Sequence, residues 1–274
     1  MNKVAIHSVP RSGSSWLGEI INSSEFINYS YQPLFSYAFK SALNEKSSLE
    51  EINEFYKNIY LSDDKFVLQK EARKNGVKPF FSKQEITHVA YKEVRYHYIL
   101  ENLLQKDSLQ KVIGLVRNPL SVLSSWKNAP REFRADLGWD FNGEWCNAEQ
   151  KNGNKKEEYF GYSKWKEAAL LYKKLSKEFP DNFLLVNYEN LLSNTSEEVK
   201  KIFNFLNLDI TAQTESFINL SGENQVNDTY SVFKKKSGAD DLWKTNIPEN
   251  IVKKVLLDCK KHGLSEFINQ PDMN

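Results

Sequence analysis

The chain has 274 residues, 40% apolar and 27% charged, with a formal net charge of +1. That composition argues against intrinsic disorder, and the near-zero charge gives no overall field that would attract nucleic acid or an anionic membrane. The length suits one large α/β domain better than two small ones, so we expect a single domain over residues 1–274.

The cysteine content and the first residues indicate the compartment. Cys146 and Cys259 are far apart and belong to no CxxC or Cys/His pattern, so a disulfide or a metal site is not expected. The amino-terminal apolar run is too short for a signal peptide, and no run approaches the roughly 20 residues of a membrane span. We therefore expect a cytoplasmic protein without an integral membrane segment.

Short runs rich in Val, Ile and Leu alternate with longer segments of helical character. The runs predict buried parallel strands at Val4–Val9, Val89–Val94, Lys111–Val116 and Phe183–Asn187. Helices are predicted at Trp16–Ser23, about 47–61, Ile99–Gln105, Leu120–Lys127, Lys164–Glu178, Ser196–Leu206 and Glu249–His262. This alternation predicts an α/β fold, a parallel sheet with helices on both faces.

The segment 128–162 does not follow this alternation, because it is polar, aromatic and loosely patterned. A long irregular segment in a compact domain is often a lid or a binding loop, so it is a candidate substrate-covering segment. A plain solvated excursion is the alternative. Trp139 and Trp145 within it could stack on sugar rings, although aromatic residues also bind phenols and lipids.

The loop after the first predicted strand has the composition of an anion site. Ser12, Gly13, Ser14 and Ser15 are small and open a helix, so backbone N–H groups and the positive end of the helix dipole face the sheet edge. Arg11 adds a planar cation that can grip phosphate or sulfate at two points. The loop predicts a phosphate-binding site.

This loop lacks the Lys-Ser/Thr ending of a nucleoside triphosphatase loop, and no later Asp is clearly placed to hold magnesium. A second loop follows the strand that ends at Arg117. Asn118 suits a helix cap and Pro119 the first helical position, and Ser125 returns to the same face two turns later. Arg117 and Ser125 can therefore meet at one anion, which suggests a ligand with two separated phosphates and no metal.

These two loops resemble those of the sulfotransferases that use 3′-phosphoadenosine 5′-phosphosulfate (PAPS). "PRSGSSW" looks like their loop for the 5′-phosphosulfate, and "RNPLSVLSS" looks like their 3′-phosphate motif. The continuation "RSGSSWLGEIIN" is most similar to the carbohydrate branch. The likeness runs from residue 4 to about 260, strong at the loops and weak between 36 and 85, and it implies the P-loop-like sulfotransferase fold.

The resemblance also implies individual roles. Arg11 and the Ser12–Trp16 backbone would bind the 5′-phosphosulfate, with Lys92 a second cation near the transferred group. Arg117 and Ser125 would bind the 3′-phosphate. Trp16 and Tyr188 would lie near the adenine, and "KSGADDLWK" resembles the loop that closes over the 3′-phosphate, with Lys236, Ser237 and Gly238 as contacts. PAPS would be the co-substrate, and no metal is required.

The sequence departs from the family pattern at the expected base. The carbohydrate branch has a Glu just before a Pro shortly after the first helix, where this chain has Gln32. An amide orients a hydroxyl but is not a useful base. Glu93 is the first substitute, although adjacent strand residues such as Lys92 and Glu93 point to opposite faces. His88 and His97 are weaker candidates.

The sequence thus predicts a sulfotransferase that acts on a hydroxyl, expected on a small-molecule, carbohydrate or glycolipid acceptor. Two other functions remain open. A kinase-like phosphotransferase would share the layered sheet but needs the missing lysine and metal site. A non-catalytic nucleotide-binding module would be compatible with Gln32.

Overall fold

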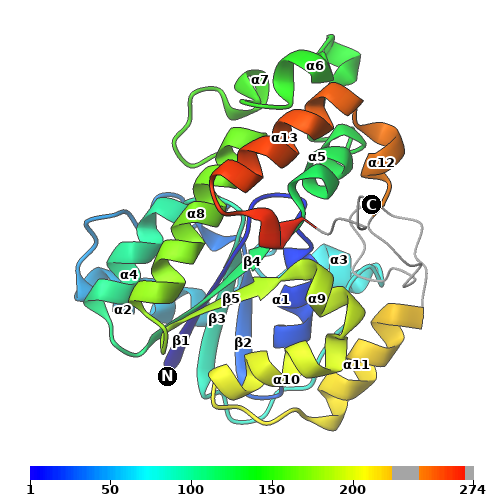
Figure 1. The fold of residues 1–274 in the computed structure, drawn as a ribbon. Helices are drawn as coiled ribbons and strands as arrows, with labels where there is room; N and C mark the ends of the chain where they lie inside the picture. The colour runs from blue at the N-terminus through cyan, green and yellow to red at the C-terminus, as the bar shows by residue number, and fades with distance from the viewer. Residues whose placement is uncertain (224–240, 269–274) are drawn as a thin grey trace.

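The computed structural model describes residues 1–223 and 241–268. Its centre is a five-stranded sheet in the order β2-β3-β1-β4-β5, and every neighbouring pair is parallel (Figure 1). The strands are β1 (Asn2–His7), β2 (Ile27–Tyr31), β3 (His88–Glu93), β4 (Gln110–Val116) and β5 (Phe183–Asn187).

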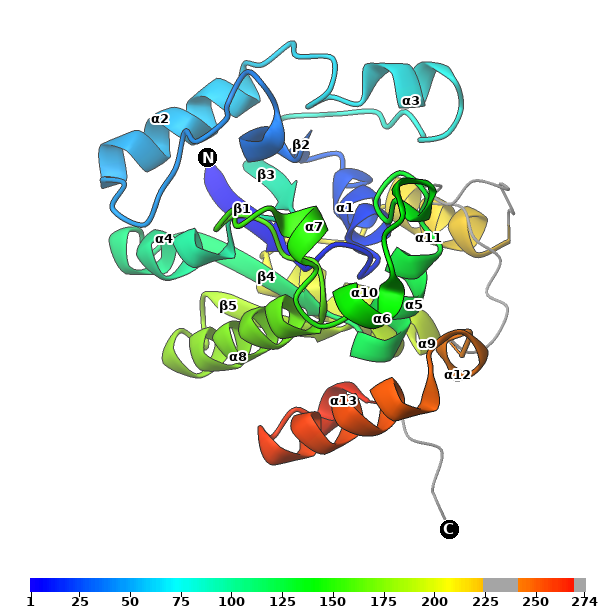
Figure 2. The ribbon, with the colours of Figure 1, turned by 90° about the horizontal axis from the view of Figure 1, so that it is seen from above.

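Helices cover both faces of this sheet (Figure 2). One face carries α1 (Ser14–Asn22), α10 (Thr195–Phe205) and α11 (Ala212–Glu223), and the other carries α2 (Leu49–Tyr60), α4 (Leu100–Lys106) and α8 (Tyr162–Glu178). The remaining helices are α3 (Lys70–Lys74), α5 (Pro119–Lys127), α6 (Phe141–Glu144), α7 (Glu149–Asn152), α9 (Tyr188–Ser193), α12 (Trp243–Asn246) and α13 (Glu249–Lys261). Short 3₁₀ turns are η1 (Pro33–Phe35), η2 (His97–Ile99), η3 (Ala135–Leu137) and η4 (Ser265–Phe267).

Each face of the sheet has its own apolar cluster. In β1, Val4 and Ile6 pack with Leu17 of α1, whereas Ala5 packs on the opposite side. Because alternate residues of a central strand face opposite layers and both layers are covered, the middle positions Val4, Ala5 and Ile6 are all apolar and buried. The predicted α/β fold with helices on both faces is confirmed.

The differences from the predicted elements have local causes. β1 ends at His7 rather than Val9: the Ser8 N–H still donates to the carbonyl of Glu93, and a turn then begins at Pro10. The edge strand β2 was not predicted, since "INYSY" alternates apolar and polar residues instead of forming an apolar run. The segment 128–162 contains η3, α6 and α7, and it lies toward the carboxyl ends of the strands (Figure 1).

Candidate active site

The loop between β1 and α1 has the backbone of an anion-binding turn. Arg11 and Gly13 have φ angles of 70° and 86°, which curl the chain just before the helix. The first turn of α1 has no capping side chain and no acidic residue. Its amide groups and positive dipole therefore remain available to an anion at the sheet edge.

The hydroxyl group of Ser12 is a second notable feature of this loop. Its side chain is fully buried, and Oγ has no hydrogen-bond partner among the described residues. Buried hydroxyl groups in proteins are normally paired, so an orphan hydroxyl in a turn of this composition calls for a partner from outside the chain. An oxygen of a phosphate group suits that need.

The two predicted loops come together. The Arg117 guanidinium donates from Nη1 to the carbonyl of Arg11 at 2.7 Å, and Arg11 donates from Nε to Ser125 Oγ at 3.1 Å. Asn118 caps α5 by accepting from the Leu120 N–H at 2.9 Å. The two motifs lie about 100 positions apart in the chain, yet Arg11, Arg117 and Ser125 form one hydrogen-bonded group.

Aromatic rings close one side of this group. The Arg117 guanidinium lies 4.8 Å from the centre of the Tyr188 ring, and Trp16 meets the same ring edge-on with centroids 6.4 Å apart. The Trp16 indole N–H is bonded to Ser221 Oγ of α11 at 3.0 Å. The two residues expected near the adenine are therefore neighbours, and both border the loop.

Lys92 and Glu93 end β3 on opposite faces of the sheet. Lys92 is 1% exposed, and its Nζ lies 4.3 Å from the centre of the Tyr31 ring. Burial lowers the pKa of Lys92, which an incoming anion would counteract. Burial raises the pKa of Glu93, whose Oε1 accepts from the Leu34 N–H at 2.8 Å.

Gln32 lies beside the end of β3 in a left-handed conformation, with φ 43°. Its backbone N–H donates to the Lys92 carbonyl at 2.8 Å, and its side-chain oxygen accepts from Arg95 Nη1 at 3.2 Å. Arg95 also donates from Nε to Glu158 Oε1 at 2.9 Å. The amide is held by a buried ion pair that reaches into the segment 128–162.

The two histidines considered as bases make contacts other than with the loops. His88 begins β3, at the opposite end of the sheet, and is bonded to the Leu206 carbonyl at 3.0 Å. His97 is fully buried and meets His7, with the two Nδ1 atoms 3.0 Å apart. Burial, and then the charge of Lys92, lower the pKa of His7 to about 3. No motif in the sequence marks His7, although it ends the strand that leads into the loop between β1 and α1.

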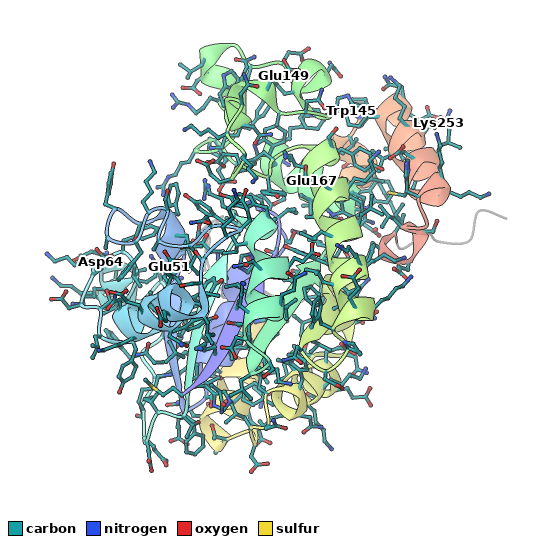
Figure 3. The ribbon with its side chains drawn as sticks, turned by 90° about the vertical axis from the view of Figure 1, so that its left-hand side faces the viewer. Glu51, Asp64, Trp145, Glu149, Glu167 and Lys253 are labelled. Atoms are coloured by element: carbon teal, nitrogen blue, oxygen red, sulfur yellow. The ribbon has the colours of Figure 1, made fainter. Side chains whose placement is uncertain are left out.

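The two tryptophans of the segment 128–162 take part in packing within the protein. Trp139 meets Phe133 edge-on with centroids 5.9 Å apart, and Trp145 stacks on Tyr162 at 6.0 Å. Figure 3 shows Trp145 in the part of the molecule beyond the sheet, near Glu149. Both side chains are half-buried.

Three further observations concern the remaining predicted contacts, metal ions and membrane spans. The predicted contacts Lys236, Ser237 and Gly238 lie outside the described residues. Within the described ranges there is no group of three or more His, Cys, Asp or Glu side chains that could hold a metal ion. In these ranges, no helix has the length and apolar character that a membrane span needs.

The protein is a parallel α/β protein in which two polar loops are joined by hydrogen bonds, and comparison with known proteins gives its family. The Sulfotransferase domain family matches residues 1–269, so the chain belongs to the sulfotransferase family. Carbohydrate sulfotransferase 5 of Mus musculus is 27% identical over 198 residues, 67% of this chain. The match covers 50% of that relative, so the chain spans about half its length.

Solved structures show the same fold. Mouse sulfotransferase SULT7A1 complexed with PAP matches with a TM-score of 0.58 at 16% identity, covering 98% of this chain and 90% of that one. A sulfotransferase from Alicyclobacillus acidocaldarius matches with a TM-score of 0.55 at 16% identity, covering 98% and 96%. The predicted sulfotransferase fold is confirmed.

Proposed function

We propose that the protein transfers a sulfuryl group from PAPS to an acceptor hydroxyl. The observation that carries this proposal is the connected group of Arg11, Ser125 and Arg117 beside the uncapped first turn of α1. It would offer cations and N–H donors to the two phosphate groups of the donor. Family membership and the buried, unpaired hydroxyl of Ser12 support the same ligand.

The residues divide between the two ends of the donor. Ser12, Gly13, Ser14, Ser15 and the backbone of Trp16 would hold the 5′-phosphosulfate, and Arg117 and Ser125 would hold the 3′-phosphate. Tyr188 and Trp16 would border the adenine. Lys236, Ser237 and Gly238 remain proposed contacts of the 3′-phosphate on the resemblance alone.

Sulfuryl transfer breaks the bond between sulfur and the 5′-phosphate oxygen, and negative charge grows on that oxygen as the bond lengthens. Arg11 and Lys92 would stabilise this charge. A cation placed in advance in a poorly solvated site stabilises the transition state more than the ground state. Lys92 is suited to this, because its buried ammonium gains most from a nearby anion.

The acceptor side would be formed by Gln32, Glu93 and the segment 128–162. Glu93 accepts from the backbone of η1 and so holds the turn that carries Gln32, whose amide would orient the acceptor hydroxyl. We propose a carbohydrate or glycolipid acceptor, supported by the resemblance to carbohydrate sulfotransferase 5. The unpaired Cys146 and Cys259 support a reducing, cytoplasmic setting.

Two measurements test the proposal. Titration calorimetry should show that 3′-phosphoadenosine 5′-phosphate (PAP) binds about 10- to 150-fold more tightly than AMP. This ratio corresponds to the binding free energy of one hydrogen bond to a charged group, roughly 1.5–3 kcal/mol. Labelled PAPS should then transfer its sulfuryl group to a member of a panel of oligosaccharides, glycolipids, phenols and sterols. Equal binding of PAP and AMP, or phosphoryl transfer from ATP, would overturn it. Tight binding of PAP without any turnover would indicate a binding module.

A further inference from the structure

The proposed reaction needs a group that takes the proton of the acceptor hydroxyl, and the contacts of Gln32 and Glu93 suit them to other roles. The Gln32 amide has no useful basicity and is bonded to Arg95. Glu93 is 0% exposed, faces away from Lys92, and holds the backbone of η1 through Oε1. Glu158 is ion-paired with Arg95 at 2.9 Å.

Glu132 places another carboxylate directly beside the anion loop. Its Oε2 lies 3.7 Å from Arg11 Nε, the nitrogen that also donates to Ser125. This oxygen is buried and has no hydrogen-bond partner in the described part of the chain. The side chain as a whole is 24% exposed, so Glu132 lies at the border of the core and not deep inside it.

The backbone around Glu132 is well anchored. Its N–H donates to the Ala129 carbonyl at 2.8 Å, and its carbonyl accepts from the Trp126 indole N–H at 3.3 Å. Trp126 is 1% exposed and belongs to α5, the helix that also carries Ser125. The same helix therefore positions both the 3′-phosphate residue and this carboxylate.

The carboxylate also acts on Lys92. Burial lowers the pKa of Lys92, and the negative charges of Glu93 and Glu132 are among those that oppose this shift. Glu132 therefore lies near Arg11 and within electrostatic reach of Lys92, the two cations assigned to the transferred sulfuryl group. An acceptor hydroxyl that reaches the sulfur between these cations would come next to this carboxylate.

We propose that Glu132 is the general base of the reaction, an inference that rests on the proposed function. The acceptor oxygen forms a bond to sulfur while the bond from sulfur to the 5′-phosphate oxygen breaks, and that bonding pair leaves with the phosphate. The acceptor proton passes to Oε2 of Glu132. Arg11 and Lys92 offset the electrostatic repulsion between this carboxylate and the anionic donor. The base can therefore lie near the sulfuryl group.

The experiment compares Glu132→Gln and Glu132→Ala with Glu93→Gln and with Glu149→Gln. Glu149 is an exposed residue of the same segment, with no side-chain role in the site (Figure 3). PAP affinity, sulfuryl transfer to the acceptor and slow PAPS hydrolysis, in which water is the acceptor, are measured for each. We expect Glu132→Gln to lower kcat about 10²- to 10⁴-fold for transfer and for hydrolysis, with PAP affinity changed less than about threefold. Added formate should restore part of the rate of Glu132→Ala, and Glu149→Gln should match the wild type.

Each result separates the alternatives. If Glu132→Gln keeps its turnover, the inference is wrong, and tighter PAPS binding would show that Glu132 merely fills the place of the anion. If Glu93→Gln is severe and Glu132→Gln is mild, Glu93 is the base. If the wild-type protein does not bind PAP, or binds it without transfer or hydrolysis, the proposed function itself fails.

Discussion

The ring of Tyr188 lies directly against the backbone of Gly13, so that a Cβ added to Gly13 would stand 2.2 Å from Cε2 of the ring. Gly13 also has a φ of 86°. Two independent constraints, a close approach and a left-handed backbone, therefore require glycine at the centre of the anion loop. The contact also fixes the distance between the loop and the ring proposed to border the adenine.

The first prediction concerns this contact. Gly13→Ala should weaken PAP binding tenfold or more and lower Tm, because the new methyl group must displace either the loop or Tyr188. Gly76→Ala is the matched control, since Gly76 has a φ of 71° with nothing within 4 Å of the added Cβ. That control carries similar backbone strain, roughly 1–2 kcal/mol, without the clash. Calorimetry measures the PAP affinity and thermal melts measure the Tm of each variant. Equal PAP affinities in the two variants would show that the contact between Gly13 and Tyr188 does not matter for binding.

The second prediction concerns the discrimination between PAP and AMP. Arg117→Ala should lower PAP affinity about 10-fold or more and leave AMP affinity nearly unchanged, because the proposed partner of this cation is the 3′-phosphate, which AMP lacks. Ser125→Ala should act in the same direction with a smaller effect. Calorimetry with both ligands is the measurement. A variant that loses affinity for both ligands equally would show that Arg117 acts by holding the Arg11 carbonyl and not by binding the phosphate.

The third prediction separates catalysis from binding at Arg11. Arg11→Ala should reduce turnover by about 10²-fold or more, while donor affinity falls less, because the charge on the leaving oxygen is greatest in the transition state. Steady-state kinetics at saturating PAPS, together with PAP calorimetry, measure the two effects. Full turnover at saturation with weakened affinity would make Arg11 a binding residue.

The fourth prediction concerns stability and pH. Burial lowers the pKa of His7 to about 3 from an ordinary value of 6.5, so the folded protein prefers the neutral ring. The unfolded chain binds the extra proton between these values, so stability is complete above pH 6.5 and falls as the pH drops toward 3. From pH 6.5 to 5, His7 should account for a loss of about 2 kcal/mol.

Urea denaturation of the wild type and of His7→Asn at both pH values tests this. The variant has its own free energy of unfolding at neutral pH, so the two proteins are compared by how much that free energy changes between pH 6.5 and 5. That change should be smaller in His7→Asn by up to about 2 kcal/mol. An identical pH dependence in the two proteins would mean that His7 is not kept neutral by its burial against His97 and Tyr91.

The sequence by itself determined the fold class and indicated the two loops that are proposed to bind the donor. Strands covered by helices are mainly apolar, which makes β1, β4 and β5 readable as short runs of Val, Ile and Leu. In β3 the apolar stretch is shorter, Val89 to Tyr91, and the buried Lys92 and Glu93 follow it. The loops were readable because their residues are neighbours in the chain: a glycine for a left-handed turn, small residues for a close approach, and an Arg with a Ser two helical turns later. Because these requirements fall on residues close together in the chain, they can be recognised in the sequence itself.

The tertiary structure decided which residues are proposed for the acceptor side. Glu132 reaches Arg11 because the chain turns back after α5, and "REFR" carries no signal of that return. Arg95 meets Gln32 and Glu158 across long separations in the chain. The edge strand β2, which pairs with β3 alone, lacked the apolar run of the inner strands. Contacts between residues far apart in sequence depend on how the layers pack, and no spacing within one segment encodes them.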